Sequence, residues 1–154
     1  MPGKLIIVCG LPGAGKSTHA RSLEGSLNAV RFCPDEWMGS LGVDLEDTSA
    51  RDKVEKLQWG VAQRLLELGQ TVLIEWGTWG RDERDILRLR AKELGATVEL
   101  HYLDAPLDVL ETRVKQRGEG PEITRDLLNE WANAFQRPSE QEGSLYDAFL
   151  TIDS

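Results

Sequence analysis

The stretch KLIIVCGLPGAGKST, residues 4–18, decides the fold. It opens with an unbroken apolar run over residues 4–9, which predicts a strand buried on both faces. A glycine-rich turn follows, and residues 16–27 predict a helix. The turn matches the pattern G-x-x-x-x-G-K-[ST] between a strand and a helix, the context that this phosphate-binding motif requires. We therefore predict a phosphate loop, and we disfavour a glycine-rich turn of some other α/β fold because strand, motif and helix are all present.

The residues of this loop have separate predicted tasks. Glycines allow backbone conformations in which successive amides turn inward around phosphate oxygens, aided by the positive end of the following helix. Lys16 is expected to reach the β and γ phosphates of ATP, and the Ser17 hydroxyl to bind Mg²⁺. The predicted nucleotide-binding residues of the loop are Gly10, Leu11, Pro12, Gly13, Ala14, Gly15, Lys16, Ser17 and Thr18.

Apolar runs and helical periods alternate along the rest of the chain. Further strands are expected at 29–33, 71–75, 97–104 and 145–153, and further helices at 48–68, 81–94, 107–117 and 124–136. In the 48–68 helix we predict one apolar stripe, made of Val54, Leu57, Val61, Leu65 and Leu68. Strands separated by helices imply right-handed crossovers. We predict a single domain over 1–154, with the three-layer α/β fold of P-loop NTPases and a mostly parallel five-stranded sheet flanked by helices.

Composition narrows the classes of function. The formal net charge is −8, which disfavours nucleic acid as a partner because nucleic-acid binding relies on many Lys and Arg contacts to phosphate. No apolar run is long enough for a membrane span, and the N-terminus resembles no signal peptide, so we expect a cytoplasmic protein without membrane contact. Cys9 and Cys33 are expected to be reduced, structural thiols.

Ligands of such sheets collect at the carboxyl ends of the strands, and Asp35 follows the second strand. Its carboxylate could orient an acceptor hydroxyl and take its proton during phosphoryl transfer. It could equally be the N-cap of a short helix starting near Glu36. Local sequence leaves these two interpretations open.

Glu75 ends the third strand, where an acidic residue would help to hold Mg²⁺ or contact the substrate. Trp76 and Trp79 follow it between glycines, and Trp37 follows Asp35. These aromatic rings could line a pocket for a sugar face or a ring, or they could belong to the core. Because three tryptophans fall at strand ends, we favour the pocket wall for Trp37, Trp76 and Trp79.

A basic helix end precedes a Gly/Pro loop near residue 118. Arg113 and Arg117 share a helix face, and one or both could meet the transferring phosphate while a lid around 117–125 closes. A solvated helix end is the alternative, which the upstream phosphate loop disfavours. Arg125 is a weaker candidate for the same role. His19 and His101 are expected to be packing or surface residues.

This arrangement resembles the small P-loop kinases, an AAA-type ATP-binding group that includes chloramphenicol phosphotransferase, zeta toxins, gluconate kinase and the kinase half of polynucleotide kinase. The resemblance covers nearly the whole chain, although only the phosphate loop is sharply specific. It implies that Asp35 activates the acceptor hydroxyl and that Arg117 or Arg113 is the lid arginine. It also implies that Arg137 and Pro138 lie near the adenine.

One departure from that group concerns the acceptor. Its polynucleotide kinases carry an arginine three positions after the catalytic aspartate, where this chain has Met38. We therefore expect a neutral or cationic acceptor, for which the acidic residues Glu36, Glu75, Asp82 and Glu83 would be suited.

The predicted function is transfer of the γ-phosphoryl group of ATP, with Mg²⁺, to a hydroxyl of a small molecule such as a sugar, an antibiotic or another alcohol. The alternatives are an ATP-binding and ATP-hydrolysing regulatory module, or a polynucleotide 5′-hydroxyl kinase. A nucleoside monophosphate kinase is disfavoured because the basic residues are scattered. Either a monomer or a homodimer is compatible with the sequence.

Overall fold

The computed structural model describes residues 2–117 and 123–153. Within these residues the strands are β1 (Lys4–Cys9), β2 (Val30–Phe32), β3 (Thr71–Gly77), β4 (Thr97–Asp104) and β5 (Ala148–Asp153). The helices are α1 (Lys16–Leu27), α2 (Pro34–Ser40), α3 (Thr48–Glu67), α4 (Arg81–Glu93), α5 (Leu107–Arg117), α6 (Arg125–Ala134) and α7 (Glu140–Gly143).

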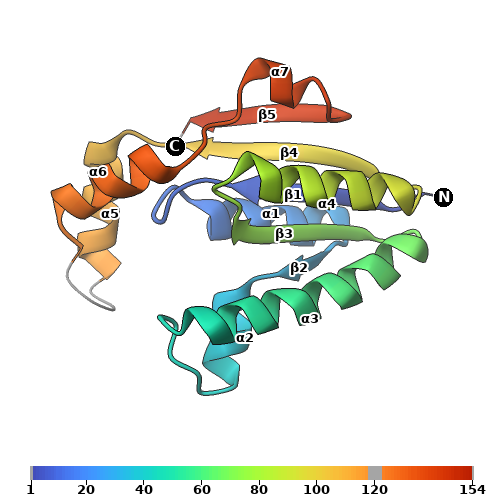
Figure 1. Cartoon of the computed structure of the whole chain (residues 1–154), viewed down its shortest axis with the longest axis horizontal. Coiled ribbons are helices and arrows are strands. Elements are labelled where there is room, and N and C mark those ends of the chain that lie inside the picture. Colours follow the sequence, from blue (N-terminus) through green and yellow to red (C-terminus); the bar gives the residue numbers. More distant parts are fainter. Residues whose placement is uncertain (1, 118–122, 154) are drawn as a thin grey trace.

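The strands form one sheet in the order β2-β3-β1-β4-β5, and every neighbouring pair is parallel. The predicted parallel five-stranded sheet is therefore confirmed. β1 lies at its centre, as its unbroken apolar run requires. Because all strands run the same way, their carboxyl ends meet at one edge, on the side where α5 and α6 lie (Figure 1).

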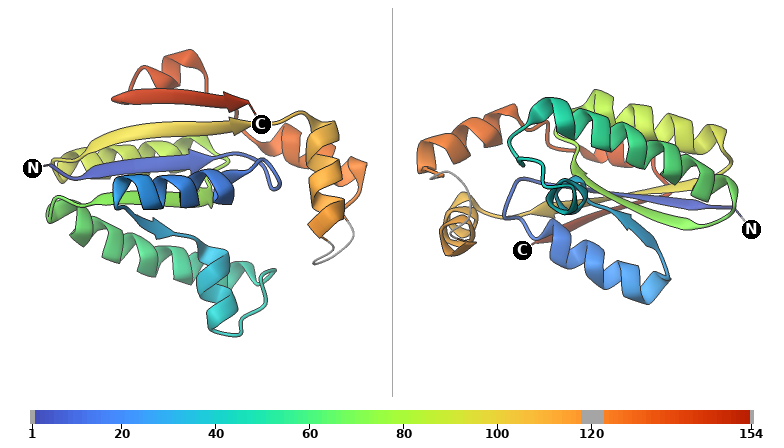
Figure 2. Two further views of the ribbon diagram at one scale, coloured as in Figure 1. Left: turned by 180° about the vertical axis from the view of Figure 1, so that it is seen from behind. Right: turned by 90° about the horizontal axis from the view of Figure 1, so that it is seen from below.

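Helices cover both faces of the sheet, with α3 and α4 on one face and α1 on the other (Figure 2). Alternate residues of β1 serve the two cores. Leu5 and Ile7 belong to the core that includes Ala62 of α3, whereas Ile6 and Val8 belong to the core that includes Ala20 of α1. Because both faces of β1 are buried under helices, the fold has three layers, with the sheet in the middle. The loop after β1 therefore begins at the centre of the carboxyl edge of the sheet.

The predicted apolar stripe of α3 is only partly confirmed: Val54 is buried and Leu65 packs against the core, whereas its other three residues are exposed. The buried residues of this helix are Val54, Gln58, Ala62 and Leu66, whereas Leu57, Val61 and Leu68 are 64%, 48% and 55% exposed. The inward face carries a small residue and an amide, and the Gln58 side chain accepts a hydrogen bond from Trp76 Nε1 at 2.9 Å. The spacing of the apolar residues alone therefore predicted a buried face of α3 that differs from the one that packs against the sheet.

The short helix α7 was not among the expected elements, α2 was expected only in one of two interpretations of Asp35 and starts earlier, at Pro34, and β5 begins three residues later than predicted. α7 is capped by the Ser139 hydroxyl, which accepts from Glu142 N at 3.1 Å. Short helices of this kind depend on caps and tertiary contacts more than on periodicity.

Candidate active site

The loop between β1 and α1 has the backbone that its glycines predict. Gly15 has a φ of 98° and Gly10 a φ of 152°, and a side chain at Gly10 would meet Leu103 O at 2.8 Å. α1 starts at Lys16 with no side-chain cap on its first turn. Lys16 Nζ reaches back across the loop to donate to Gly10 O at 2.7 Å. The loop thus combines an uncapped helix N-terminus with an ammonium group, the two features that hold phosphate.

Glu75 lies beside Ser17 at the end of β3. Ser17 Oγ donates to Glu75 Oε1 at 2.6 Å, and Arg31 of β2 donates to Glu75 Oε2 at 3.0 Å. The Glu75 side chain is only 3% exposed, so a bare carboxylate there would be strongly disfavoured. The hydroxyl and the guanidinium both donate hydrogen bonds to this carboxylate and so compensate for its burial next to the loop.

A cavity of about 990 Å³ opens over this loop at the carboxyl edge of the sheet. It brings together residues from β3, α1, α2, α3 and α5 that are far apart in the sequence. The predicted site residues that line it are Pro12, Gly13, Gly15, Lys16, Ser17, Thr18, Asp35, Glu75, Trp76, Trp79 and Arg113.

Asp35 lies in the first turn of α2, and its side chain is 57% exposed. The N-cap of this helix is Cys33, with Pro34 at the first helical position, so the N-cap interpretation of Asp35 was wrong. Its carboxylate forms an ion pair with Arg51 Nη2 at 2.7 Å. Asp35 is therefore a carboxylate that lines the cavity, held there by a cation from α3.

The three tryptophans differ in position. Trp76 lines the cavity and packs edge-on against Trp59, and Trp79 lines it and contacts the rings of Trp131 and Phe135. Trp37 is not among the residues that line the cavity; its ring packs edge-on against Phe32 with 5.9 Å between ring centroids. The aromatic part of the cavity wall thus comes from the end of β3, which contains Trp76, and from the segment after it, which contains Trp79.

The basic residues of α5 and α6 also differ. Arg113 Nη1 donates to Gly13 O at 3.0 Å and so lies against the phosphate loop. Arg117 ends α5, but its side chain and residues 118–122 of the predicted lid lie outside the described part of the chain. Arg125 pairs with Asp108 at 2.6 Å and with Glu111 at 3.1 Å, which joins α6 to α5.

A second cavity of about 300 Å³ lies on the other side of the loop. Leu11 and Ala14 of the loop line it, together with Tyr102, Phe135 and Arg137. Tyr102 and Phe135 are stacked with centroids 5.7 Å apart, and Arg137 lies over Tyr102 and pairs with Asp104 at 2.6 Å. Pro138, predicted beside Arg137, is buried and does not line this cavity.

Two of the acidic residues expected to suit a cationic acceptor are already paired. Glu36 binds Arg31 at 2.6 Å and Arg21 at 3.1 Å, and these arginines lower the pKa of its carboxyl. Glu75 is held by the same Arg31. Neither carboxylate carries an uncompensated charge toward the cavity.

Sequence reasoning missed Arg31, Arg51, Tyr102 and Phe135. Arg31 lies between the exposed Val30 and the buried Phe32 in a strand of three residues, which is too short for its pattern to predict an acidic partner. Nothing in the local sequence marks Arg51, because its position beside Asp35 depends on how α3 packs against α2.

The two cysteines and the two histidines were expected to have no part in the chemistry, although Cys33 and His19 also line the larger cavity. Cys9 and Cys33 are free and buried, as expected, and burial raises the pKa of the Cys33 thiol to about 11, so that it stays protonated. His19 Nε2 lies 2.9 Å from His101 Nδ1, and burial lowers the pKa of His19. Over the described ranges, no helix has the length and apolarity to cross a membrane.

The chain is similar to several known proteins. The Arabidopsis thaliana gluconokinase is 31% identical over 93 residues, covering 56% of this chain and 49% of that protein. The adenylyl-sulfate kinase of Shewanella amazonensis is 34% identical over 125 residues, covering 72% and 58%. The chain thus spans about half the length of the curated relatives that it matches.

Solved structures share the fold. The APS kinase CysC of Mycobacterium tuberculosis, solved with AMPPNP and APS, superposes with a TM-score of 0.67 at 24% identity, covering 98% of this chain and 90% of that one. The family described as "AAA domain" matches residues 5–138, which include the phosphate loop, Asp35, Glu75 and Arg113. The predicted resemblance is thereby confirmed at the level of the family: the chain belongs to the AAA domain family, with kinases of the small P-loop type among its relatives.

Proposed function

We propose that this chain is an ATP-dependent phosphotransferase that moves the γ-phosphoryl group to a hydroxyl of a small molecule. The observation that carries the proposal is the shared cavity of about 990 Å³, in which Asp35 lies with Lys16 and Ser17. A carboxylate facing a phosphate loop is what phosphoryl transfer to an alcohol requires. The kinase names of the two curated relatives support the same reaction.

The nucleotide would extend across both cavities. Its phosphates would lie on the loop, against Lys16 and the first turn of α1, and its base would enter the second cavity. That cavity offers the stacked rings of Tyr102 and Phe135 and the guanidinium of Arg137, which suit a flat heteroaromatic ring. The loop lines both cavities, so one nucleotide can reach each of them.

Ser17 and Glu75 are suited to hold Mg²⁺. Magnesium keeps several waters and takes few protein oxygens besides those of the phosphates. Among the described residues no three His, Cys, Asp or Glu side chains gather, so a metal held by protein alone is unsupported here. A bound Mg²⁺ would neutralise charge that develops on the transferring phosphate.

Asp35 would orient the acceptor hydroxyl. As the acceptor oxygen bonds to the γ-phosphorus, the bond from that phosphorus to the β–γ bridging oxygen breaks, ADP leaves, and the hydroxyl proton moves to the Asp35 carboxylate. Arg113, which lies against the loop at Gly13, would stabilise charge on the phosphate. Trp76 and Trp79 would line the acceptor side.

The charge of the acceptor is reconsidered from the position of Arg51. Met38, which suggested an acceptor without a phosphate, is fully buried and faces no ligand. Arg51 lines the cavity, and its Nη2 binds both Asp35 and Leu45 O, whereas its Nε and Nη1 have no partner among the described residues. A carboxylate or phosphate on the acceptor could accept a charge-assisted hydrogen bond from one of these two nitrogens. We therefore favour a hydroxyl compound that carries an anionic group over a cationic one.

The test is a screen of hydroxyl compounds, with neutral, anionic and cationic members and an oligonucleotide with a free 5′-hydroxyl, for acceptor-dependent formation of ADP. Asp35→Asn should bind ATP as the parent does and lose turnover by about a hundredfold or more. Lys16→Ala should lose ATP binding. Asp44→Asn, a change to an exposed carboxylate after α2, serves as the matched control.

Two outcomes would contradict the proposal. If Asp35→Asn turns acceptor over like the parent, Asp35 has no role in transfer. If no compound stimulates ADP formation and slow hydrolysis is the only activity, the regulatory module is the better interpretation.

A further inference from the structure

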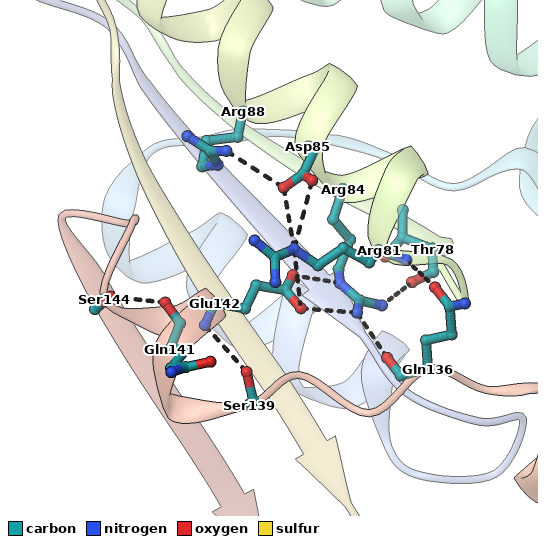
Figure 3. A network of polar contacts seen from close by, with 10 residues as sticks. All are labelled: Thr78, Arg81, Arg84, Asp85, Arg88, Gln136, Ser139, Gln141, Glu142 and Ser144. Atoms are coloured by element: carbon teal, nitrogen blue, oxygen red, sulfur yellow. Dashed lines mark hydrogen bonds and ion pairs between the residues drawn. The ribbon is translucent and has the colours of Figure 1, made fainter.

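Arg84 is a completely buried cation whose hydrogen bonds join three separate segments of the chain (Figure 3). Nε and Nη2 bind the two oxygens of Glu142 at 2.7 and 3.0 Å. Nη1 donates to Thr78 O at 2.7 Å, and Nη2 also donates to Gln136 O at 2.6 Å. We call Arg84 and Glu142 the buried pair.

A contribution to folding stability alone does not explain the buried pair. Bringing a guanidinium and a carboxylate out of water is unfavourable, and apolar residues of similar volume often stabilise a protein equally well or better. What apolar residues cannot do is bind the two carbonyl oxygens of Thr78 and Gln136. The arrangement therefore points to a role in fixing those two peptide groups.

The first of these peptide groups precedes the wall of the larger cavity. Thr78 has a φ of 42°, in the left-handed region that a β-branched residue rarely adopts. Its carbonyl is held by Arg84, and the next residue is Trp79, which lines the cavity over the phosphate loop. The bond to Arg84 thus supports the unusual backbone that directs Trp79.

The second peptide group joins Gln136 to Arg137, which lines the smaller cavity. Gln136 stands between Phe135 and Arg137, both of which line that cavity. Its backbone N donates to Trp79 O at 2.8 Å, and its Oε1 accepts from Arg81 N at 2.6 Å. Gln136 is therefore bound to the loop after β3 through its amide, and to α4 through its carbonyl and its side chain.

Trp79 and Phe135 are in contact, with ring centroids 6.4 Å apart, and each lines one of the two cavities. We call them the aromatic wall. The Arg84 guanidinium also lies 5.9 Å from the centre of the Phe135 ring. Arg84 thus binds the peptide group that joins Thr78 to Trp79, and it contacts Phe135 directly and through the carbonyl of the next residue, Gln136.

We infer that Arg84, together with Glu142, is a positioning residue that sets the aromatic wall and through it the affinity for the nucleotide base. This inference rests on the proposed function, in which the base enters the smaller cavity. The phosphate loop is held by other contacts, so the buried pair should affect the base and leave the phosphates unaffected.

The test compares binding of ATP with binding of inorganic tripolyphosphate, which has the phosphates without the base. Affinities are measured by calorimetry with Mg²⁺, well below the unfolding temperature of each variant. Arg84→Met should weaken ATP binding between about threefold and tenfold, the size of one aromatic contact, and change tripolyphosphate binding less than about twofold.

Two further variants make the result decisive. Arg84→Met with Glu142→Leu removes both buried charges, which guards against loss of folding from an unpaired Glu142, and should show the same selective loss. Arg88→Met removes an arginine one turn along α4 that pairs with Asp85 and lies over Tyr146, and it should leave both affinities unchanged.

Equal weakening of both ligands, or of neither, in the double variant would overturn the inference, because a purely structural role predicts no difference between them. If the parent binds tripolyphosphate as tightly as ATP, the base cavity itself is refuted. That outcome identifies the proposed function as the part that failed.

Discussion

Ser17 Oγ and Glu75 Oε1 lie 2.6 Å apart, so the first helix after the phosphate loop is tied to the end of the neighbouring strand by one short hydrogen bond. The bond is possible because Glu75 follows Leu73 on the same side of β3, the side that α1 covers. It places a hydroxyl and a carboxylate together beside Lys16. The pair is the part of the site that we propose for Mg²⁺.

Removal of the Ser17 hydroxyl should uncouple nucleotide binding from Mg²⁺. For Ser17→Ala and for Glu75→Gln we expect Mg²⁺ to improve ATP affinity by about tenfold less than in the parent, the usual loss for a disturbed metal site. Ser17→Thr keeps a hydroxyl and should retain the Mg²⁺ effect. A titration of ATP with and without Mg²⁺ measures this, and an undiminished Mg²⁺ effect in Ser17→Ala would refute the assignment.

Arg31 should be important for folding as well as for the site. Its side chain is 7% exposed, and it binds Glu75 at 3.0 Å and Glu36 at 2.6 Å. Arg31→Met would leave the buried Glu75 charge without its guanidinium and should lower the free energy of unfolding by about 3 kcal/mol. Urea denaturation measures the change.

The exposed Arg21 gives the comparison, because it also pairs with Glu36 but stays in water. Arg21→Met should change the free energy of unfolding by less than about 1 kcal/mol. Equal effects of the two substitutions would show that burial of the Arg31 to Glu75 pair is unimportant.

Arg51 should discriminate acceptors by charge once acceptors are found. We expect Arg51→Met to raise KM for anionic hydroxyl compounds by about tenfold or more, the value of a hydrogen bond to a charged group, with a smaller effect on neutral ones. Lys53→Met removes an exposed charge nearby and should leave KM unchanged. The measurement is steady-state kinetics with an anionic hydroxyl compound and a neutral one of matched structure. Equal increases in KM for the two compounds would exclude anion binding by Arg51.

The sequence was informative wherever the chemistry of a site is local. The phosphate loop, the strand before it and the helix after it are contiguous in the sequence. The sequence motif therefore identifies directly the residues that the loop needs, such as Gly15 with its positive φ and Lys16 with its ammonium group. The parallel sheet was likewise predictable, because buried parallel strands read as continuous apolar runs. That Asp35 and Glu75 lie at one cavity could be predicted, because the ends of parallel strands meet at one edge.

The sequence failed where a position depends on packing between distant elements. Arg51 pairs with Asp35 only because α3 returns beside α2, and Gln58 occupies the inward face of α3 only because Trp76 donates to it. Glu142 and Arg84 lie 58 positions apart in the chain, and neither residue has a local pattern that predicts its burial. Such pairs follow from the tertiary structure and cannot be inferred from periodicity.

Glu55 of α3 should make stability depend on pH in a direction opposite to that of most carboxylates. Burial raises the pKa of its carboxyl from 4.5 to about 7, Arg51 opposes that shift, and the neighbouring Asp52 and Glu83 add to it. The folded chain therefore holds a proton that the unfolded chain releases between these two values. The stability contribution of protonated Glu55 is complete below about pH 4.5 and is lost as pH rises through about 7.

Glu55→Gln removes this titration. Relative to the parent, the variant should gain Tm progressively from pH 5 to pH 8, because the parent must either ionise a half-buried group or take up a proton. Thermal unfolding by circular dichroism across that range measures the difference, and Glu67→Gln, at the exposed far end of α3, serves as the control. The prediction is contradicted if the Tm of Glu55→Gln and the Tm of the parent change equally with pH, or if the Tm of the parent rises relative to that of the variant toward pH 8. Either result would show that Glu55 ionises at least as readily in the folded chain as in the unfolded one.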